Sequence, residues 1–168
     1  MKSKKLISIA LCAAALFCLL SACGGGSGSS GVRSDVAVGD ISKAVSAVLS
    51  DDALVSVDGN YVSGSMKMDV SQYDSYDVKI NSKGVNIDEF GIFKAKDASG
   101  GVKAVQKAVA DYLQMRKDTW MKEYMPQEHP KLENAEVKTK GEYVMYAILS
   151  DSDKEAAFSA FEKSLASK

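Results

Sequence analysis

Cysteine, histidine and proline are scarce in this 168-residue sequence, which contains three, one and two of them respectively. All three cysteines, Cys12, Cys18 and Cys23, lie in or at the edge of an apolar N-terminal segment. Residues 24–168 therefore contain no thiol. That absence excludes a disulfide scaffold, a zinc site made of thiolates and a cysteine nucleophile from the rest of the chain.

The single histidine, His129, lies between Glu128 and Pro130, a setting typical of an exposed loop. A site with two histidine ligands is excluded, and a Ser-His-Asp arrangement would have to recruit this loop residue. We therefore predict no catalytic residue, no metal ligand and no cofactor, and a hydrolase is disfavoured.

Positive charge is also in short supply once the N-terminal Lys2, Lys4 and Lys5 are set aside. The remaining residues comprise 18 basic and 22 acidic side chains. A chain without an excess of basic residues lacks the electrostatic requirement for nucleic-acid binding. We predict no nucleic-acid partner.

The N-terminal segment combines a basic cluster, an almost entirely apolar stretch over residues 6–20 and the small residues Ser21 and Ala22 before Cys23. This is the pattern of an export signal, and the apolar stretch is shorter than the ~20 residues of a spanning helix. Residues 20–23 (LSAC) resemble the bacterial lipobox, in which the cysteine receives a diacylglyceryl group and the chain is cut before it. Two acyl chains, of which palmitate is one expected type, suffice for stable anchoring.

We accordingly predict three segments: a signal peptide over residues 1–22, a lipidated Cys23 with a Gly/Ser tether over residues 23–34, and one domain over residues 35–168. The tether would reach on the order of 18 Å as a flexible coil. The predicted location is the outer face of the cytoplasmic membrane.

Hydrophobic periodicity predicts an α+β domain. Asp40 is expected to cap a short helix, and residues 51–72 are expected to form a loop with short extended pieces. Strands are predicted near residues 76–80, 87–95, 135–137 and 143–149, of which the second and fourth are apolar on both sides. Asp97 is expected to cap a long helix that Pro126 stops, and Asp151 or Asp153 begins a final helix.

The predicted order is a short N-terminal helix and then ββαββα, giving a four-stranded, mainly antiparallel sheet with the helices packed on one face. The two ββα halves echo each other, which leaves an internal duplication open.

Four segments carry a resemblance to a known family: residues 86–95 (NIDEFGIFKA), 124–126 (YMP), 132–137 (LENAEV) and 141–144 (GEYV). In these segments the chain resembles the small lipoproteins of Gram-positive bacteria catalogued as domain of unknown function 4358, over roughly residues 40–163. The resemblance implies an α+β domain and the same lipoprotein location. It implies no reaction and no catalytic residue.

Arg116 falls in the middle of the apolar stripe of the long predicted helix, between Leu113 and Trp120. An unpaired charge buried there would be costly. We therefore expect Arg116 at the rim of the sheet, with its stem buried and its guanidinium paired with a carboxylate such as Glu89. Trp120 and Tyr124 either pack under residues 51–72 and the loop over residues 126–130 or form a partner surface, and packing is favoured. Tyr73 is expected to be the freest aromatic residue.

Aspartates near the first predicted hairpin raise the question of a calcium site, but their spacing matches no ion-wrapping loop. We expect solvated charges that discourage pairing at the sheet edge; the residues are Asp69, Asp74, Asp77 and Asp88.

Taken together, the sequence predicts a non-enzymatic binding or accessory module that is held at the cell envelope by lipid on Cys23. Its expected partner is an envelope protein, a peptide or a glycan. A carboxylate-dependent envelope enzyme or enzyme subunit remains the alternative.

Overall fold

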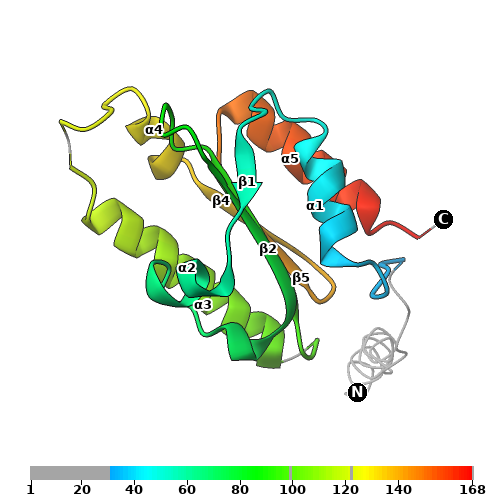
Figure 1. Ribbon diagram of the computed structural model, residues 1–168. Helices are drawn as coiled ribbons and strands as arrows, with labels where there is room; N and C mark the ends of the chain where they lie inside the picture. Colours follow the sequence, from blue (N-terminus) through cyan, green and yellow to red (C-terminus); the bar gives the residue numbers. More distant parts are fainter. Residues whose placement is uncertain (1–30, 99, 122, 168) are drawn as a thin grey trace, which may run out of the picture. The chain divides into compact units, whose positions relative to one another are not determined.

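The computed structural model describes residues 31–98, 100–121 and 123–167. They form an α+β domain around a five-stranded antiparallel sheet with the strand order β1-β2-β3-β5-β4 (Figure 1). The strands are β1 (Leu54–Ser56), β2 (Tyr73–Asn81), β3 (Glu89–Ala95), β4 (Glu136–Lys140) and β5 (Tyr143–Ile148). No helix among these residues has the length and apolar composition of a membrane span.

The helices are α1 (Val38–Ser46), α2 (Gly59–Gly64), α3 (Gly100–Asp118), α4 (His129–Glu133) and α5 (Asp151–Ser164), with a 3₁₀ turn over Val70–Gln72. The α+β class, the β2–β3 and β4–β5 hairpins and the final helix are as predicted. Gly84 and Gly141 in the two hairpin turns adopt positive φ angles of 65° and 59°, which glycine tolerates best.

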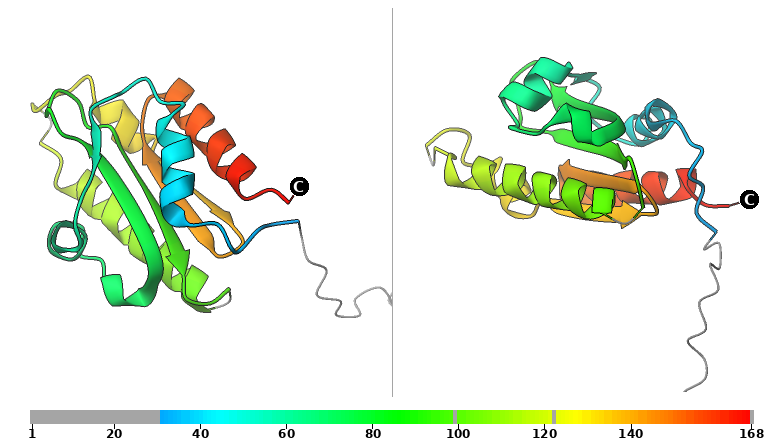
Figure 2. Two further views of the ribbon diagram at one scale, coloured as in Figure 1. Left: turned by 45° about the vertical axis from the view of Figure 1, so that its right-hand side comes forward. Right: turned by 90° about the horizontal axis from the view of Figure 1, so that it is seen from below.

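The prediction that the helices pack on one face is wrong. Helices α1 and α5 cover one face of the sheet and α3 covers the other, so the sheet lies between two helical layers (Figures 1 and 2). Alternate residues of β3 explain this arrangement: Phe90 and Ile92 contact α1 and α5, whereas Phe93 and Ala95 contact α3. Because β3 and β5 are apolar on both sides, each face needs a cover.

Residues 51–72 contain more structure than predicted. Leu54–Ser56 add a fifth strand at the edge of the sheet beside β2. Asp58 accepts a hydrogen bond from the Tyr61 N–H and thereby caps α2. An N-terminal cap of this kind compensates for the poor helix propensity of Gly59 and Gly64.

Two helix ends also differ from the prediction. Helix α1 begins at Val38 without a side-chain cap, so Asp40 lies in its first turn. Helix α3 ends at Asp118, well before Pro126, and Thr119 directs both its backbone N–H and its hydroxyl to the Met115 carbonyl. At its start, Gly101 donates its N–H to Asp97, in agreement with the predicted cap.

The chain contacts the domain from its first described residues. Val32 forms an antiparallel bridge with Ala166, and the Arg33 N–H donates to the Leu165 carbonyl. The Tyr143 hydroxyl donates to the carbonyls of Ser34 and Val36. Residues 32–34, which the tether prediction includes, are thus held against the C-terminal end of the domain.

Candidate functional site

The first residue of the central strand β3, Glu89, has a buried carboxylate. Glu89 is 2% exposed, and its side chain lies on the α3 face of the sheet, the face shared by Gly91 and Phe93. Strand alternation places it there, since residues two apart point to the same side. A buried carboxylate requires hydrogen-bond donors.

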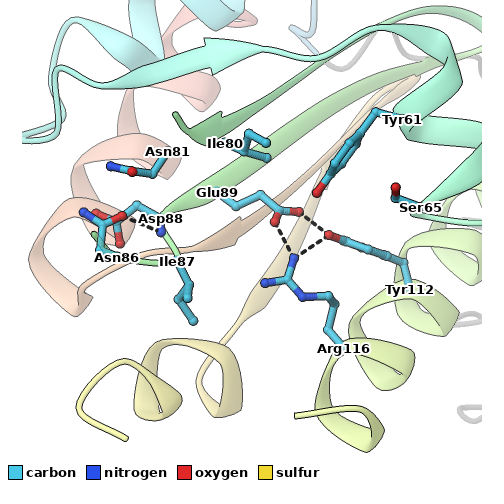
Figure 3. A pocket seen from close by; sticks show the side chains of 10 residues that line it. All are labelled: Tyr61, Ser65, Ile80, Asn81, Asn86, Ile87, Asp88, Glu89, Tyr112 and Arg116. Atoms are coloured by element: carbon cyan, nitrogen blue, oxygen red, sulfur yellow. Dashed lines mark hydrogen bonds and ion pairs between the residues drawn. The ribbon is translucent and has the colours of Figure 1, made fainter. Parts of the chain in front are cut away.

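Three side chains from two other elements supply those donors, and Figure 3 shows the two that come from α3, Tyr112 and Arg116. The hydroxyls of Tyr112 and Tyr146 both donate to Glu89 Oε1 at 2.6 Å. Arg116 donates from Nη1 to Glu89 Oε2 at 2.5 Å and to the Tyr112 hydroxyl oxygen at 2.6 Å. Tyr112 and Arg116 meet the same carboxylate because they are four residues apart on α3. The predicted Arg116–Glu89 pair and the rim position of Arg116 are confirmed.

Gly91 makes room for this network. A Cβ atom at Gly91 would lie 2.3 Å from Cε1 of Tyr146, its cross-strand neighbour. The missing side chain lets the Tyr146 ring lie across β3, where its hydroxyl reaches Glu89. Glycine in a strand often marks such a close approach.

Burial and the Glu89 charge keep both tyrosines in their donating form. Burial and then the neighbouring carboxylate raise the pKa of Tyr112 well above its ordinary value, and the same causes raise the pKa of Tyr146. Burial works against the charge of Arg116, but the Glu89 carboxylate raises its pKa overall. Both tyrosines are therefore neutral and Arg116 is positively charged at neutral pH.

This cluster forms part of the wall of a pocket of about 270 Å³ (Figure 3). Its lining residues come from α2, β2, the β2–β3 loop, β3 and α3 and are Tyr61, Ser65, Ile80, Asn81, Asn86, Ile87, Asp88, Glu89, Tyr112 and Arg116. Within the described residues, the hydroxyls of Tyr61 and Ser65 donate no hydrogen bond, and Arg116 uses Nη1 alone. These groups are free to form hydrogen bonds with a ligand.

The opposite wall is held rigid by Asp51. Its Oδ2 accepts from Asn81 Nδ2 at 2.7 Å and from Asn86 Nδ2 at 3.1 Å, and its Oδ1 accepts from the Ala53 N–H. Burial tends to raise the pKa of Asp51, but these hydrogen bonds lower it overall. The two asparagines are therefore occupied within the protein.

Asp88, next to Glu89, is paired as well. Lys131 of α4 lies 2.6 Å from its Oδ1 and 2.8 Å from Oε2 of Glu128. Burial raises the pKa of Asp88, although Lys131 opposes the shift. These contacts tie the β2–β3 loop to α4, and the Glu128 carboxylate also accepts from the Ile87 N–H.

Trp120 and Tyr124 follow α3 rather than belonging to it. The Trp120 ring stacks on His129 with centroids 5.4 Å apart, and it contacts the core on the α3 face. Packing is thus confirmed for Trp120, whereas Tyr124 is 51% exposed and its predicted packing is wrong. Met121 beside them is 66% exposed.

Tyr73 does not join this surface. It is buried against Phe93 and Tyr76, and burial raises its pKa to about 12. Its expected freedom is wrong because its side chain points to the covered α3 face. Tyr73 pairs with Ala95, at the end of β3 far from Glu89, so the length of that strand separates it from the Glu89–Arg116 pair.

The four aspartates weighed as calcium ligands are dispersed over separate contacts. Asp69 binds Ser71 and Gln72, Asp74 pairs with Lys94, Asp77 accepts from Ser42, and Asp88 pairs with Lys131. Within the described ranges, no three histidine, cysteine, aspartate or glutamate residues are grouped to hold a metal ion. His129 lies beside Glu133, with 3.2 Å between Nε2 and Oε1.

The predicted signal peptide and the lipidation site Cys23 lie outside the described residues. Sequence reasoning found Arg116 and its partner Glu89, but it assigned Tyr112 to the core stripe and did not single out Tyr146, Tyr61 or Ser65. The hydroxyl of Tyr112 on that stripe could have indicated the network, because a buried tyrosine hydroxyl normally has a hydrogen-bond partner.

A family model described as a domain of unknown function, DUF4358, matches residues 47–149. The chain belongs to this family. The match contains β1 to β5, α3 and every residue that lines the pocket. Neither the curated proteins nor the solved structures contain a match to this chain.

Proposed function

We propose that this protein is a non-enzymatic binding module, anchored by lipid on Cys23 at the outer face of the cytoplasmic membrane, and that the Glu89–Arg116 pocket is its ligand site. The single observation that carries the proposal is the state of Arg116. Its Nη1 is committed to Glu89 and Tyr112, while Nε and Nη2 donate to no described residue. A held cation with free donors at a pocket wall is a prepared binding group.

The chemistry of the carboxylates supports binding rather than catalysis. Glu89 accepts three hydrogen bonds, so its oxygens are occupied by donors before any substrate arrives. Asp88 is held by Lys131. A general base needs a free oxygen within reach of the proton that it removes.

Lipid anchoring supports the envelope location. The export pattern and the LSAC segment motivate it, and the family match covers the domain that would be displayed. Partners in reach would be envelope proteins, peptides and glycans.

The test is a thermal shift of the mature lipidated protein in detergent against fractions of solubilised cell envelope. One fraction should raise the melting temperature, since a ligand that binds only the folded state stabilises it. Ser65→Trp, at an exposed position of the pocket mouth directly after α2, should abolish the shift, and Ser63→Trp, at an exposed position within α2, should retain it.

Stabilisation that persists in Ser65→Trp would contradict the choice of pocket. Recovery of chemically altered ligand after incubation would favour the alternative, a carboxylate-dependent enzyme.

A further inference from the structure

Both carboxylates that line the pocket are paired with a cation. Arg116 lies 2.5 Å from Glu89, and Lys131, outside the lining, lies 2.6 Å from Asp88 and 2.8 Å from Glu128. Neither lining carboxylate is therefore without a cationic partner. Ion pairs of this kind cancel most of each other's field beyond their own length.

An anionic ligand fits this wall poorly. To reach the free donors of Arg116 it would approach the carboxylates of Glu89 and Asp88, which line the same pocket. Like charges at such distances in a partly buried site are strongly unfavourable.

A cationic ligand fits no better. The oxygens of Glu89 already accept from two tyrosines and Arg116, and Asp88 already accepts from Lys131. A cation would have to displace these donors and leave buried groups without partners, which is unfavourable.

The free groups suit a neutral ligand that carries oxygen acceptors and hydroxyls. Arg116 can donate, and the hydroxyls of Tyr61 and Ser65 can both donate and accept. The Tyr61 ring and the side chains of Ile80 and Ile87 add apolar surface to the same pocket (Figure 3). A ring that is apolar on its faces and hydroxylated around its edge matches both kinds of lining.

Size limits the ligand to one such ring. The pocket volume of about 270 Å³ is at the lower end of the ~300–1,000 Å³ that ligand pockets span. An extended ligand could place only one unit inside it.

From this balance of charge, polarity and size we infer that the pocket binds one ring of an uncharged sugar within a glycan chain. The inference rests on the proposed function, because it names the ligand class of the same site.

The experiment uses the mature lipidated protein in detergent and three oligosaccharide probes of different charge. They are an oligomer of N-acetylglucosamine, which is neutral, its deacetylated cationic counterpart, and an anionic oligogalacturonate. Calorimetric titration at low and high salt gives each dissociation constant. We expect the neutral oligomer to bind at least tenfold more tightly than either charged probe, with little dependence on salt.

Ser65→Trp should weaken binding of the neutral oligomer at least tenfold, and Ser63→Trp should leave it unchanged. Tighter binding of the anionic probe, weakened by salt, would overturn the inference and make Arg116 an anion receptor. Absence of neutral-sugar binding would also overturn it. If an envelope fraction still stabilises the protein through Ser65 in that case, the proposed function stands; if none does, both fail.

Discussion

At the scale of single residues, Glu89 shows how a charge can be retained inside a small domain. Its carboxylate is nearly inaccessible, and the donors that satisfy it come from α3 and β5. One side chain thus connects the strand in the middle of the sheet to the helix that covers it. The same contacts orient Arg116 toward the pocket.

Replacing Glu89 should therefore be costly. Glu89→Ala leaves the Arg116 guanidinium and two buried tyrosine hydroxyls without their acceptor, and we expect a loss of about 3 kcal/mol in the free energy of unfolding. Urea denaturation measures it. Glu155→Ala, at an exposed position of α5, is the control and should cost less than about 0.5 kcal/mol. Equal losses in the two variants would contradict the role given to Glu89.

Gly91 allows a second test at this scale. Gly91→Ala would place a Cβ within 2.3 Å of the Tyr146 ring, and we expect a loss of about 1–3 kcal/mol, as for overpacked cores. Gly39→Ala is the matched control because nothing lies within 4 Å of its Cβ position on α1. That variant should be neutral or more stable, since alanine favours helix. Thermal unfolding compares the two, and a neutral Gly91→Ala would show that Tyr146 is free to move.

At the scale of elements, the helices and strands with a strong hydrophobic periodicity were predicted from the sequence. Short elements such as α2 were missed. The apolar stripe of α3 was clear enough to show that Arg116 interrupts it, which led directly to Glu89. Helix α2 has two glycines in six residues, so no helical pattern was visible. Tyr61 and Ser65 were overlooked for that reason, and with them one side of the pocket.

The distribution of helices over the sheet was predicted wrongly although the sequence contained the relevant signal. Strands that are apolar on both sides, as β3 and β5 are, require two covered faces. The placement of the helices also contradicts an internal duplication. A two-fold axis that exchanged the two hairpins would place α3 and α5 on the same face, and they lie on opposite faces.

The start of α5 is connected to the segment after α1 by Asp153. Its carboxylate accepts from the Ser50 hydroxyl at 2.7 Å and from the Ser150 hydroxyl at 2.9 Å. Burial alone would raise the pKa of Asp153, but these hydrogen bonds lower it below the ordinary 3.8. The ionised form is therefore the one that stabilises the fold.

A pH dependence follows. Stability contributed by a carboxylate with a lowered pKa is present above its unfolded-state pKa and is lost as the pH falls through the folded-state value. Asp153→Ala should cost about 1 kcal/mol at pH 7, and this difference from the wild type should shrink below about pH 4. Urea denaturation at several pH values measures it. A difference that grows with acid would contradict the assignment.

At the scale of the whole molecule, the domain is a sheet covered on both faces, with its pocket on the α3 side and its first described residues beside its last. The predicted anchor precedes that N-terminal contact in the sequence. The proposed membrane anchor and the proposed ligand pocket thus lie in separate parts of the chain, so each can be removed without the other.

The proposed lipid anchor is tested by removing the sulfur atom of Cys23. Cys23→Ala removes the thiol that the lipobox would modify, so radiolabelled lipid should no longer enter the protein and membrane retention should be lost. Cys18→Ala is the control and should retain both. Lipid labelling that persists in Cys23→Ala would contradict the lipoprotein assignment.

The pocket is tested most directly in living cells. A photo-reactive amino acid at position 65 should crosslink the protein to envelope material on illumination, because this position lies at the pocket mouth. The same amino acid at position 63, which is exposed and lies within α2, should give little product. Selective crosslinking from position 65 to a glycan is the result that the account predicts. Equal crosslinking from both positions, or none from position 65, would contradict it.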